Sequence, residues 1–402
     1  MTDPVDIVHL TFLPPFATGS YNRFVGAQME KLTEFRQAAI SYWAAPQPET
    51  AWRADDTILV NGDGLSWGRE LFLRLPERIR QRYYYSIGGR EHLIYTWRVV
   101  ELVAKLRPKI IVCYDGYKLG RPLRDAIDWP CRIILGQCGL TYNQPQLDAM
   151  RVYSLQSFDV VWTQTRISYR YDRDRLVLYE PMVMVLPNGV DASQYQPVSP
   201  TEKASVRAEW ELPQDKLVIL LLSRQVPKKG THLIVQSWPK IVHEVPEAYL
   251  WIVGTADLEY ERYIKGLIDR LELSNSVRLQ GAVTPEKTAG CYQAADLYVF
   301  PTLAGEGMSN TLLEAMACGL ACVASEHASA RELYSDEEVL FVPDANIGDA
   351  FVRPIVRLLC DSSLRRRIGE AARTAVEQRY SQDIIFDQLR ECYRQQMGLV
   401  SG

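Results

Sequence analysis

The sequence predicts an α/β protein built from two doubly wound domains, each a mainly parallel sheet covered by helices on both faces. The chain has 402 residues, and a domain usually holds roughly 100–200 residues, so the length favours two domains. Short apolar runs alternate along the chain with longer amphipathic stretches. The runs show no polar alternation, which is typical of parallel strands buried on both faces.

The predicted strands fall into two series. The first series holds residues 5–10, 57–60, 109–113, 132–136 and 159–163, and the second holds 182–186, 216–222, 249–253, 276–279, 297–300 and 321–324. Helices are predicted over 22–35, 92–106, 259–271, 309–318, 362–379 and 380–397. Ligands of doubly wound sheets bind at the carboxyl ends of the strands, so we expect the functional residues in the loops that follow these runs.

A polar segment with two prolines, residues 194–205, separates the two halves of the chain. This composition is typical of a connection between domains. We therefore expect one Rossmann-like domain over 1–195 and a second over 196–379, facing each other across a cleft. Residues 380–402 are expected to form a helix that packs back on the first domain.

The composition is that of an ordinary globular protein, with 47% hydrophobic residues, 23% charged residues and a net charge of -4, which argues against nucleic acid as a partner. The start lacks the basic head and long apolar stretch of a signal peptide, and no window of about 18 residues is continuously apolar. We therefore expect a cytoplasmic protein. The cysteines form no Cys-x-x-Cys pair and the histidines lack metal-ligand spacing, so no metal or other cofactor is expected.

The segment GEGMSNTLLEAMACGLACVAS (305–325) carries the strongest chemical signal. Glu306 and Glu314 are separated by seven residues, and the intervening GMSNT can form a tight turn into a helix capped by Ser309 or Asn310. Such a turn would present backbone N–H groups and the positive end of the helix dipole to an anion. Carboxylates suit paired hydrogen bonds to sugar or ribose hydroxyls. The alternative is that Glu314 only solvates an ordinary helix.

The segment LLLSRQVPKKGTHLIV (220–235) places cations directly after a predicted strand. Arg224 follows the apolar run, and Lys229 precedes Gly230 and the next helix. A guanidinium and a nearby ammonium at this edge of a sheet suit a diphosphate, although a solvated basic turn is the alternative. A third segment, VLPNGVDASQYQP (185–197), has weak chemistry of its own and is interpreted as a structured turn between the domains.

Together these segments resemble the retaining glycosyltransferases of family four, which have the GT-B fold. The matching features are the Glu-x7-Glu motif, the Arg followed by Lys-Gly, the Pro-Asn-Gly-Val-Asp segment, LQGAVT (279–284) and AADLYVFPT (294–302). The resemblance implies an acceptor-binding first domain and a donor-binding second domain. It implies that Glu306 contacts the donor sugar, Glu314 the ribose and the backbone of Val283 the base, and that Arg224 and Lys229 neutralise the leaving diphosphate. It further implies that the backbone of Gly307, Met308, Ser309 and Asn310 lines the sugar and phosphate, and that Thr311 belongs to the same donor-binding turn.

The amino-terminal half matches the family less well. Where members have a glycine-rich loop, this chain offers only Gly19 and Ser20; Gly19 would let the backbone approach a phosphate. Where many members place a histidine near the donor sugar, this chain has Tyr114 and Asp115. Asp115 is the best substitute, and Gln137 and Cys138 are weaker candidates.

The resemblance implies transfer of a hexose or N-acetylhexosamine, with retention, from a nucleotide sugar to a glycan, lipid-linked or small-molecule acceptor. The Gly-Met-Ser-Asn variant favours a UDP-linked donor. Residues 69–90 mix arginines with tyrosines and leucines, which suits peripheral membrane contact, a phosphate-bearing acceptor or simply a solvated helix. We expect no metal: Asp172 and Asp174 have metal-ligand spacing, but arginines surround them.

Three other functions compete with transfer. A sugar-nucleotide epimerase can share the GT-B architecture, but it would need acid and base carboxylates and no acceptor pocket. A non-catalytic glycan- or nucleotide-binding protein would not need the intact set of arginine, lysine and glutamates. A nicotinamide-dependent oxidoreductase is disfavoured because no Gly-x-Gly-x-x-Gly follows a strand.

Overall fold

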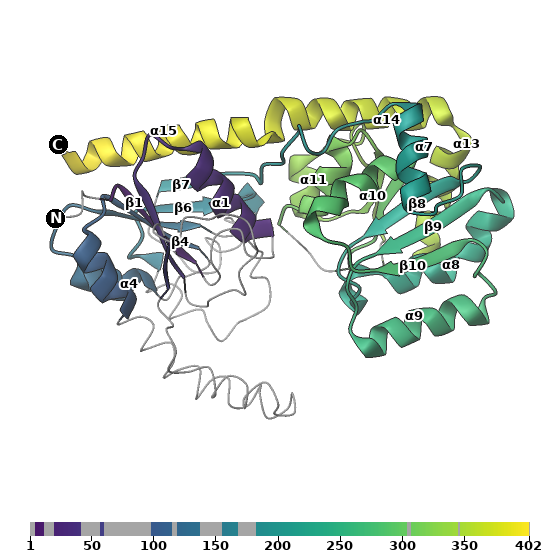
Figure 1. Ribbon diagram of the computed structural model, residues 1–402, viewed down its shortest axis with the longest axis horizontal. Coiled ribbons are helices and arrows are strands. Elements are labelled where there is room, and N and C mark those ends of the chain that lie inside the picture. The colour runs from purple at the N-terminus through teal and green to yellow at the C-terminus, as the bar shows by residue number, and fades with distance from the viewer. Residues whose placement is uncertain are drawn as a thin grey trace. The chain divides into compact units, whose positions relative to one another are not determined.

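A computed structural model describes residues 5–11, 20–41, 57–59, 98–114, 119–136, 155–167, 182–303, 307–344 and 346–401. The chain divides into two compact units (Figure 1). Unit 1 comprises residues 1–186 and 386–402, and unit 2 comprises residues 187–385. The predicted domain border at 195/196 lies within unit 2, a few residues beyond this division.

Unit 1 contains a seven-stranded parallel sheet in the order β3-β2-β1-β4-β5-β6-β7. The strands are β1 Ile7–Thr11, β2 Gln37–Ser41, β3 Thr57–Leu59, β4 Ile110–Tyr114, β5 Arg132–Gly136, β6 Val160–Thr163 and β7 Met182–Val185. Its helices include α1 Ser20–Lys31, α4 Gly120–Ala126 and most of α15 Gln382–Ser401. Phe386 of α15 packs on Phe24 of α1 at a ring-centroid distance of 5.6 Å, so the end of the chain covers the same face as α1.

One strand belongs to a different series from the one we expected. Residues 182–186 are predicted to open the second series, but β7 pairs in parallel with β6, with Val160 opposite Met182. This prediction is wrong because an apolar run of this length fits either sheet, and only the pairing partner distinguishes them. Strands β2 and β13 Leu340–Val342 were not predicted.

Unit 2 contains a six-stranded parallel sheet in the order β10-β9-β8-β11-β12-β13. Besides β13, its strands are β8 Leu217–Leu222, β9 Ala248–Val253, β10 Val277–Gly281, β11 Leu297–Phe300 and β12 Ala321–Ser325. Its helices are α7 Pro200–Glu209, α8 Thr231–Glu244, α9 Leu258–Arg270, α10 Thr288–Ala294, α11 Asn310–Ala317, α12 Ala328–Leu333, α13 Val352–Cys360 and α14 Ser362–Ala375. The predicted doubly wound fold class is confirmed, because in each sheet the strand order reverses about the first strand.

The helices of unit 2 cover both faces of its sheet (Figure 1). Successive residues of β9 point to opposite sides, so that Trp251 joins one core and Ile252 the other. The first core includes Tyr292 of α10 and Leu312 of α11, and the second includes Trp238 of α8 and Ile264 of α9. Two packed faces explain why the strands are apolar along their whole length.

Asp296, in the AADLYVFPT segment, has a structural role at the start of β11. Its carboxylate accepts hydrogen bonds from the Val218 backbone N–H at 2.7 Å, Lys203 at 2.6 Å and Arg207 at 2.5 Å. Burial alone would raise the pKa of Asp296, but the charges of Lys203 and Arg207 outweigh it and hold the pKa below its ordinary value. The residue lies at the amino end of the strand and therefore opposite the edge where ligands of this fold bind.

Side chains of β1, β2 and β4 form a buried polar cluster in unit 1. His9 is fully buried, and its Nε2 lies 2.9 Å from Gln37 Oε1 while its Nδ1 lies 3.1 Å from the Tyr114 hydroxyl. Gln37 also donates from Nε2 to Leu32 O at 2.9 Å, which fixes its amide. With Gln37 Oε1 accepting from His9 Nε2, Nδ1 accepts from Tyr114; the amide nitrogen of Gln28 also lies 3.2 Å from His9 Nε2 and 3.4 Å from Nδ1. Burial lowers the pKa of His9 to about 4.

Acid should destabilise unit 1 through His9. Between pH 6.5 and about 4 the histidine is protonated in the unfolded chain and neutral in the folded chain. Protonation therefore favours the unfolded chain, and the free energy of unfolding, which is highest above pH 6.5, decreases as the pH falls through this range. We expect His9 to account for a loss of about 2 kcal/mol in the free energy of unfolding between pH 7 and pH 5. Urea unfolding of the wild type and of His9→Gln at both pH values measures this loss. An equal loss in the variant would contradict this assignment.

Candidate functional site

The loop after β8 presents Arg224 on a rigid support. Arg224 is exposed, whereas the next residue, Gln225, is 1% exposed. Gln225 donates from Nε2 to Ser223 O at 2.9 Å and to Val253 O at 3.2 Å, and its Oε1 accepts from Thr231 Oγ1 at 2.6 Å. The guanidinium therefore projects from a loop whose neighbouring residue is fixed on three sides. Gln225 was not among the predicted site residues, although a polar residue between an apolar strand and a basic turn is the signal that could have found it.

The turn that carries Lys229 is joined to the end of β11. Residues Pro227–Lys229 form a single 3-10 turn, and Lys229 Nζ lies 5.2 Å from the centre of the Phe300 ring. The carbonyl of Lys228 accepts a hydrogen bond from Leu303 N at 2.7 Å. β8 and β11 are adjacent strands at which the order of the sheet reverses, and crevices at such points bind ligands.

Gly230 makes this junction possible. Its φ is +71°, and a Cβ at this position would lie 1.9 Å from the Pro301 carbonyl oxygen. Only glycine accepts both the left-handed backbone and the close approach. The same residue stands at the start of α8, so one glycine fixes the basic turn, the helix and the segment after β11.

The turn before α11 has the predicted geometry of a capped helix N-terminus. Of the two predicted N-caps, the structure selects Ser309, whose Oγ accepts from Leu312 N at 3.3 Å. Asn310 and Thr311 open the helix, where the first backbone N–H groups have no partner within the helix. Gly307 and Met308 precede the cap, with Met308 buried in one of the two cores. The arrangement suits an anion.

Glu314 lies one turn inside α11, and a tyrosine of α10 holds its carboxylate. Its Oε2 accepts a hydrogen bond from the Tyr292 hydroxyl at 2.8 Å. Tyr292 is fully buried, and burial raises the pKa of its hydroxyl well above the ordinary value. Tyr292 therefore stays protonated and acts as the donor. The carboxylate has a fixed position, as a group that grips a ligand requires.

Val283 follows β10, whose end is connected to the loop of Arg224 through β9. Gly254 N donates to Gly281 O at 2.7 Å, and a Cβ on Gly254 would lie 1.8 Å from Ser223 O. The half-buried Val283 packs against the core that contains Tyr292. The carboxyl ends of β10, β9, β8 and β11 thus form one continuous edge.

The Pro-Asn-Gly segment contacts the turn before α11, which the sequence did not reveal. Asn188 donates from Nδ2 to Asn310 Oδ1 at 2.6 Å and to Met308 O at 3.3 Å. Its backbone N–H points to the Met308 sulfur at 3.1 Å. The segment is therefore more than a connection between units, because it supports the turn before α11.

Several predicted site residues lie outside the described part of the chain: Gly19, Asp115, Glu306, the alternatives Gln137 and Cys138, residues 69–90, and Asp172 with Asp174. Ser20 is the first residue of α1. β4 ends at Tyr114, directly before Asp115. Their roles stay predictions. Within the described residues, no group of three or more His, Cys, Asp or Glu is placed to hold a metal ion. No described helix is long and apolar enough to cross a membrane.

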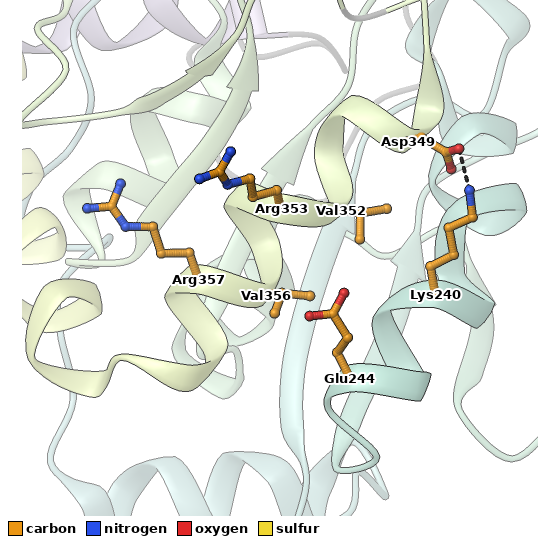
Figure 2. A pocket seen from close by; sticks show the side chains of 7 residues that line it. All are labelled: Lys240, Glu244, Asp349, Val352, Arg353, Val356 and Arg357. Carbon is orange, nitrogen blue, oxygen red and sulfur yellow. Dashed lines mark hydrogen bonds and ion pairs between the residues drawn. The ribbon is translucent and has the colours of Figure 1, made fainter.

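A hollow of about 520 Å³ in unit 2 lies between the last turns of α8 and the first turns of α13 (Figure 2). Lys240 and Asp349 form an ion pair at one side, and Arg353 and Arg357 project from α13 at the other. Glu244 completes its charged lining. Cations and carboxylates nearly balance, and none of these residues lies in the loops at the carboxyl edge. We assign this hollow no role in the site.

Comparison with known proteins agrees with this geometry. Residues 202–375 match the family described as glycosyl transferases group 1. The GDP-mannose-dependent monoacylated alpha-(1-6)-phosphatidylinositol monomannoside mannosyltransferase of Corynebacterium glutamicum is 29% identical over 210 residues, which are 51% of this chain and 54% of that protein. Phosphatidyl-myo-inositol mannosyltransferase of Mycobacterium tuberculosis is 29% identical over 212 residues, 52% of this chain and 53% of that protein. The chain thus spans about half the length of the curated relatives it matches.

Solved structures resemble nearly the whole chain. Sucrose-phosphate synthase from Thermosynechococcus elongatus has a TM-score of 0.78 at 22% identity, covering 98% of this chain and 100% of that one. HepE of Anabaena, solved in complex with UDP, has a TM-score of 0.76 at 16% identity, covering 97% and 100%. At identities this low, the structural similarity establishes the fold alone. It confirms the predicted GT-B fold.

Proposed function

Because residues 202–375 belong to the glycosyl transferases of group 1, we propose that the chain transfers a hexose or N-acetylhexosamine from a nucleotide sugar, with retention of anomeric configuration. The acceptor is a glycan, a lipid-linked molecule or a small molecule. One observation carries the proposal. The basic loop after β8 is joined to the segment that follows β11 at the reversal point of the sheet, through the 2.7 Å bond from Leu303 N to Lys228 O, and α11 begins seven residues after Leu303.

The proposed chemistry is stabilisation of a leaving nucleoside diphosphate. The acceptor hydroxyl attacks the anomeric carbon as the bond to the phosphate oxygen breaks, and the departing phosphate takes the acceptor proton. Negative charge grows on the diphosphate, where Arg224, Lys229 and the N-terminus of α11 face it in this proposal. An ion pair at 4 Å is worth about 4 kcal/mol at an effective dielectric of 20, and such stabilisation is usually the largest catalytic contribution. No residue is assigned as a nucleophile.

The remaining assignments follow the same proposal. Glu314, held by Tyr292, binds the ribose hydroxyls, Glu306 binds the donor sugar and Val283 meets the base through its backbone. Asp115 takes the place of the family histidine, and Gly19 and Ser20 approach the donor phosphate. The cations supply the positive charge that a divalent ion supplies in other transferases, so transfer is proposed to continue in excess chelator.

We propose UDP as the carrier nucleotide, on the basis of the Gly-Met-Ser-Asn turn. The name of the C. glutamicum relative instead specifies GDP-mannose, so parallel assays with UDP-sugars and GDP-mannose decide between the two. The names of both bacterial relatives specify phosphatidylinositol-based acceptors. This supports a lipid-linked acceptor and, of the three interpretations of residues 69–90, favours peripheral membrane contact.

Substitution of Glu314 by glutamine tests the site. An amide accepts hydrogen bonds more weakly than a carboxylate, so we expect nucleotide affinity to fall about tenfold, with a smaller change in kcat because the ribose is remote from the breaking bond. Glu370→Gln, on the exposed surface of α14, is the matched control and should bind normally. Calorimetric titration with UDP and GDP gives both affinities. Unchanged affinities in Glu314→Gln would make Glu314 a structural partner of Tyr292 alone.

A further inference from the structure

The hydrogen bonds around Asn188 fix the direction of another side chain, Asn310. We infer that Asn188 is a positioning residue: it turns the carboxamide of Asn310 so that the NH2 group of Asn310 donates to an oxygen of the bound nucleotide sugar. The inference rests on the proposed function and adds a side-chain donor to a turn whose predicted role was confined to its backbone.

The orientation of both amides follows from one contact. Asn188 Nδ2 lies 3.3 Å from the carbonyl oxygen of Met308, which can only accept. The group of Asn188 at this position must therefore be its NH2. The same nitrogen lies 2.6 Å from the side chain of Asn310, so the atom of Asn310 that faces it must be the oxygen. Within a planar carboxamide the NH2 of Asn310 then points away from Asn188 as a donor.

Asn188 can impose this orientation because the two residues that follow it are anchored outside the turn. Two residues later, Val190 N donates to Tyr380 O at 2.9 Å, and Gln382 N donates to Val190 O at 2.9 Å. Gly189 is packed so closely that a Cβ would lie 3.0 Å from the Gln382 Cα. Residues 189 and 190 are therefore anchored to residues 380–382, and Asn188 joins the turn before α11 to that anchor.

The position of Asn310 makes its NH2 a useful donor. Asn310 is the first residue of α11, where unpaired backbone N–H groups and the helix dipole favour anionic or oxygen-rich ligands. An amide that turned over would present its carbonyl oxygen there and repel a phosphate or compete for a hydroxyl proton. The ligand group is therefore a phosphate oxygen or a sugar hydroxyl, both of which accept from N–H.

The test combines a double-mutant cycle with Asn310→Asp, a variant that is expected to keep the wild-type stability. Asn188→Ala, Asn310→Ala and the double variant are titrated with UDP, GDP and the preferred nucleotide sugar, with Ser193→Ala in the same exposed segment as control. Asn310→Asp keeps the oxygen that Asn188 holds and suits the first turn of a helix, but it replaces the NH2 by a negative oxygen. We expect Asn310→Asp to unfold at the wild-type temperature or above it and to bind the nucleotide sugar at least about tenfold more weakly.

The cycle separates positioning from direct contact. We expect Asn188→Ala to weaken binding by about three- to tenfold in the wild-type background and by little in the Asn310→Ala background, because there is no amide left to orient. Loss of affinity for the free nucleotide identifies a phosphate as the ligand group, and loss for the nucleotide sugar alone identifies a sugar hydroxyl. Losses that multiply, or normal binding by Asn310→Asp, overturn the inference while the proposed function stands. Failure of the wild type to bind any nucleotide sugar overturns both.

Discussion

Alanine in place of Arg224 or Lys229 is expected to lower turnover by about a hundredfold or more, because each substitution removes a cation from the developing charge of the diphosphate. The fold should survive. Arg224 is exposed, and the contact of Lys229 with the Phe300 ring is worth about 0.5–1 kcal/mol. The measurement is kcat for transfer from the best donor, together with the unfolding temperature of each variant.

Lys228→Ala is the matched control for this pair. Lys228 is exposed in the same turn, and its hydrogen bonds with Leu303 and Thr302 use its backbone carbonyl, which the substitution retains. We expect near-normal turnover in this variant. Turnover near the wild-type value in both Arg224→Ala and Lys229→Ala would refute the role given to the loop.

Gly230→Ala is expected to damage stability and activity together. Its φ of +71° is strained for alanine, and the added Cβ would lie 1.9 Å from the Pro301 carbonyl oxygen, a backbone atom that cannot move alone. We expect a loss of at least about 2–3 kcal/mol in the free energy of unfolding. The segment after β11 must shift away from the basic turn, so turnover should fall as well.

Gly266→Ala supplies the comparison. Gly266 lies within α9, and a Cβ there would meet nothing within 4 Å. Alanine in that helix should be neutral or stabilising by up to about 1 kcal/mol. Urea unfolding and turnover are measured on both variants. Equal stability of the two would mean that the junction at Pro301 is looser than the structure indicates.

The fold and the local parts of the site could be predicted from the sequence because short-range patterns determine them. Residues 216–222 are predicted as a strand and form β8, and the cations that follow lie at its carboxyl end. The cap at Ser309 and the helix that carries Glu314 likewise depend on neighbouring residues. The residues that determine each of these features lie within a few positions of one another in the sequence.

What the sequence did not reveal depends on partners far along the chain. Asn188 contacts residues 308 and 310, and Glu314 depends on Tyr292. The strand β7 is predicted in the wrong series because its partner, β6, is not encoded in its own residues. Gly230 has the sequence context of an ordinary turn glycine, since the Pro301 oxygen that demands it lies in another loop.

The most direct test of the proposed donor site is calorimetric titration of the full chain with UDP-sugars and GDP-mannose in excess EDTA, repeated with Arg224→Ala. We predict that one donor binds to the wild type in a single-site isotherm without added metal. We also predict that Arg224→Ala, folded normally, binds the same donor at least about tenfold more weakly, because a charge-assisted contact to the diphosphate is gone. Equal affinity of the wild type and Arg224→Ala for the donor, or binding that appears only when magnesium or manganese is restored, would contradict a metal-independent site built on the basic loop.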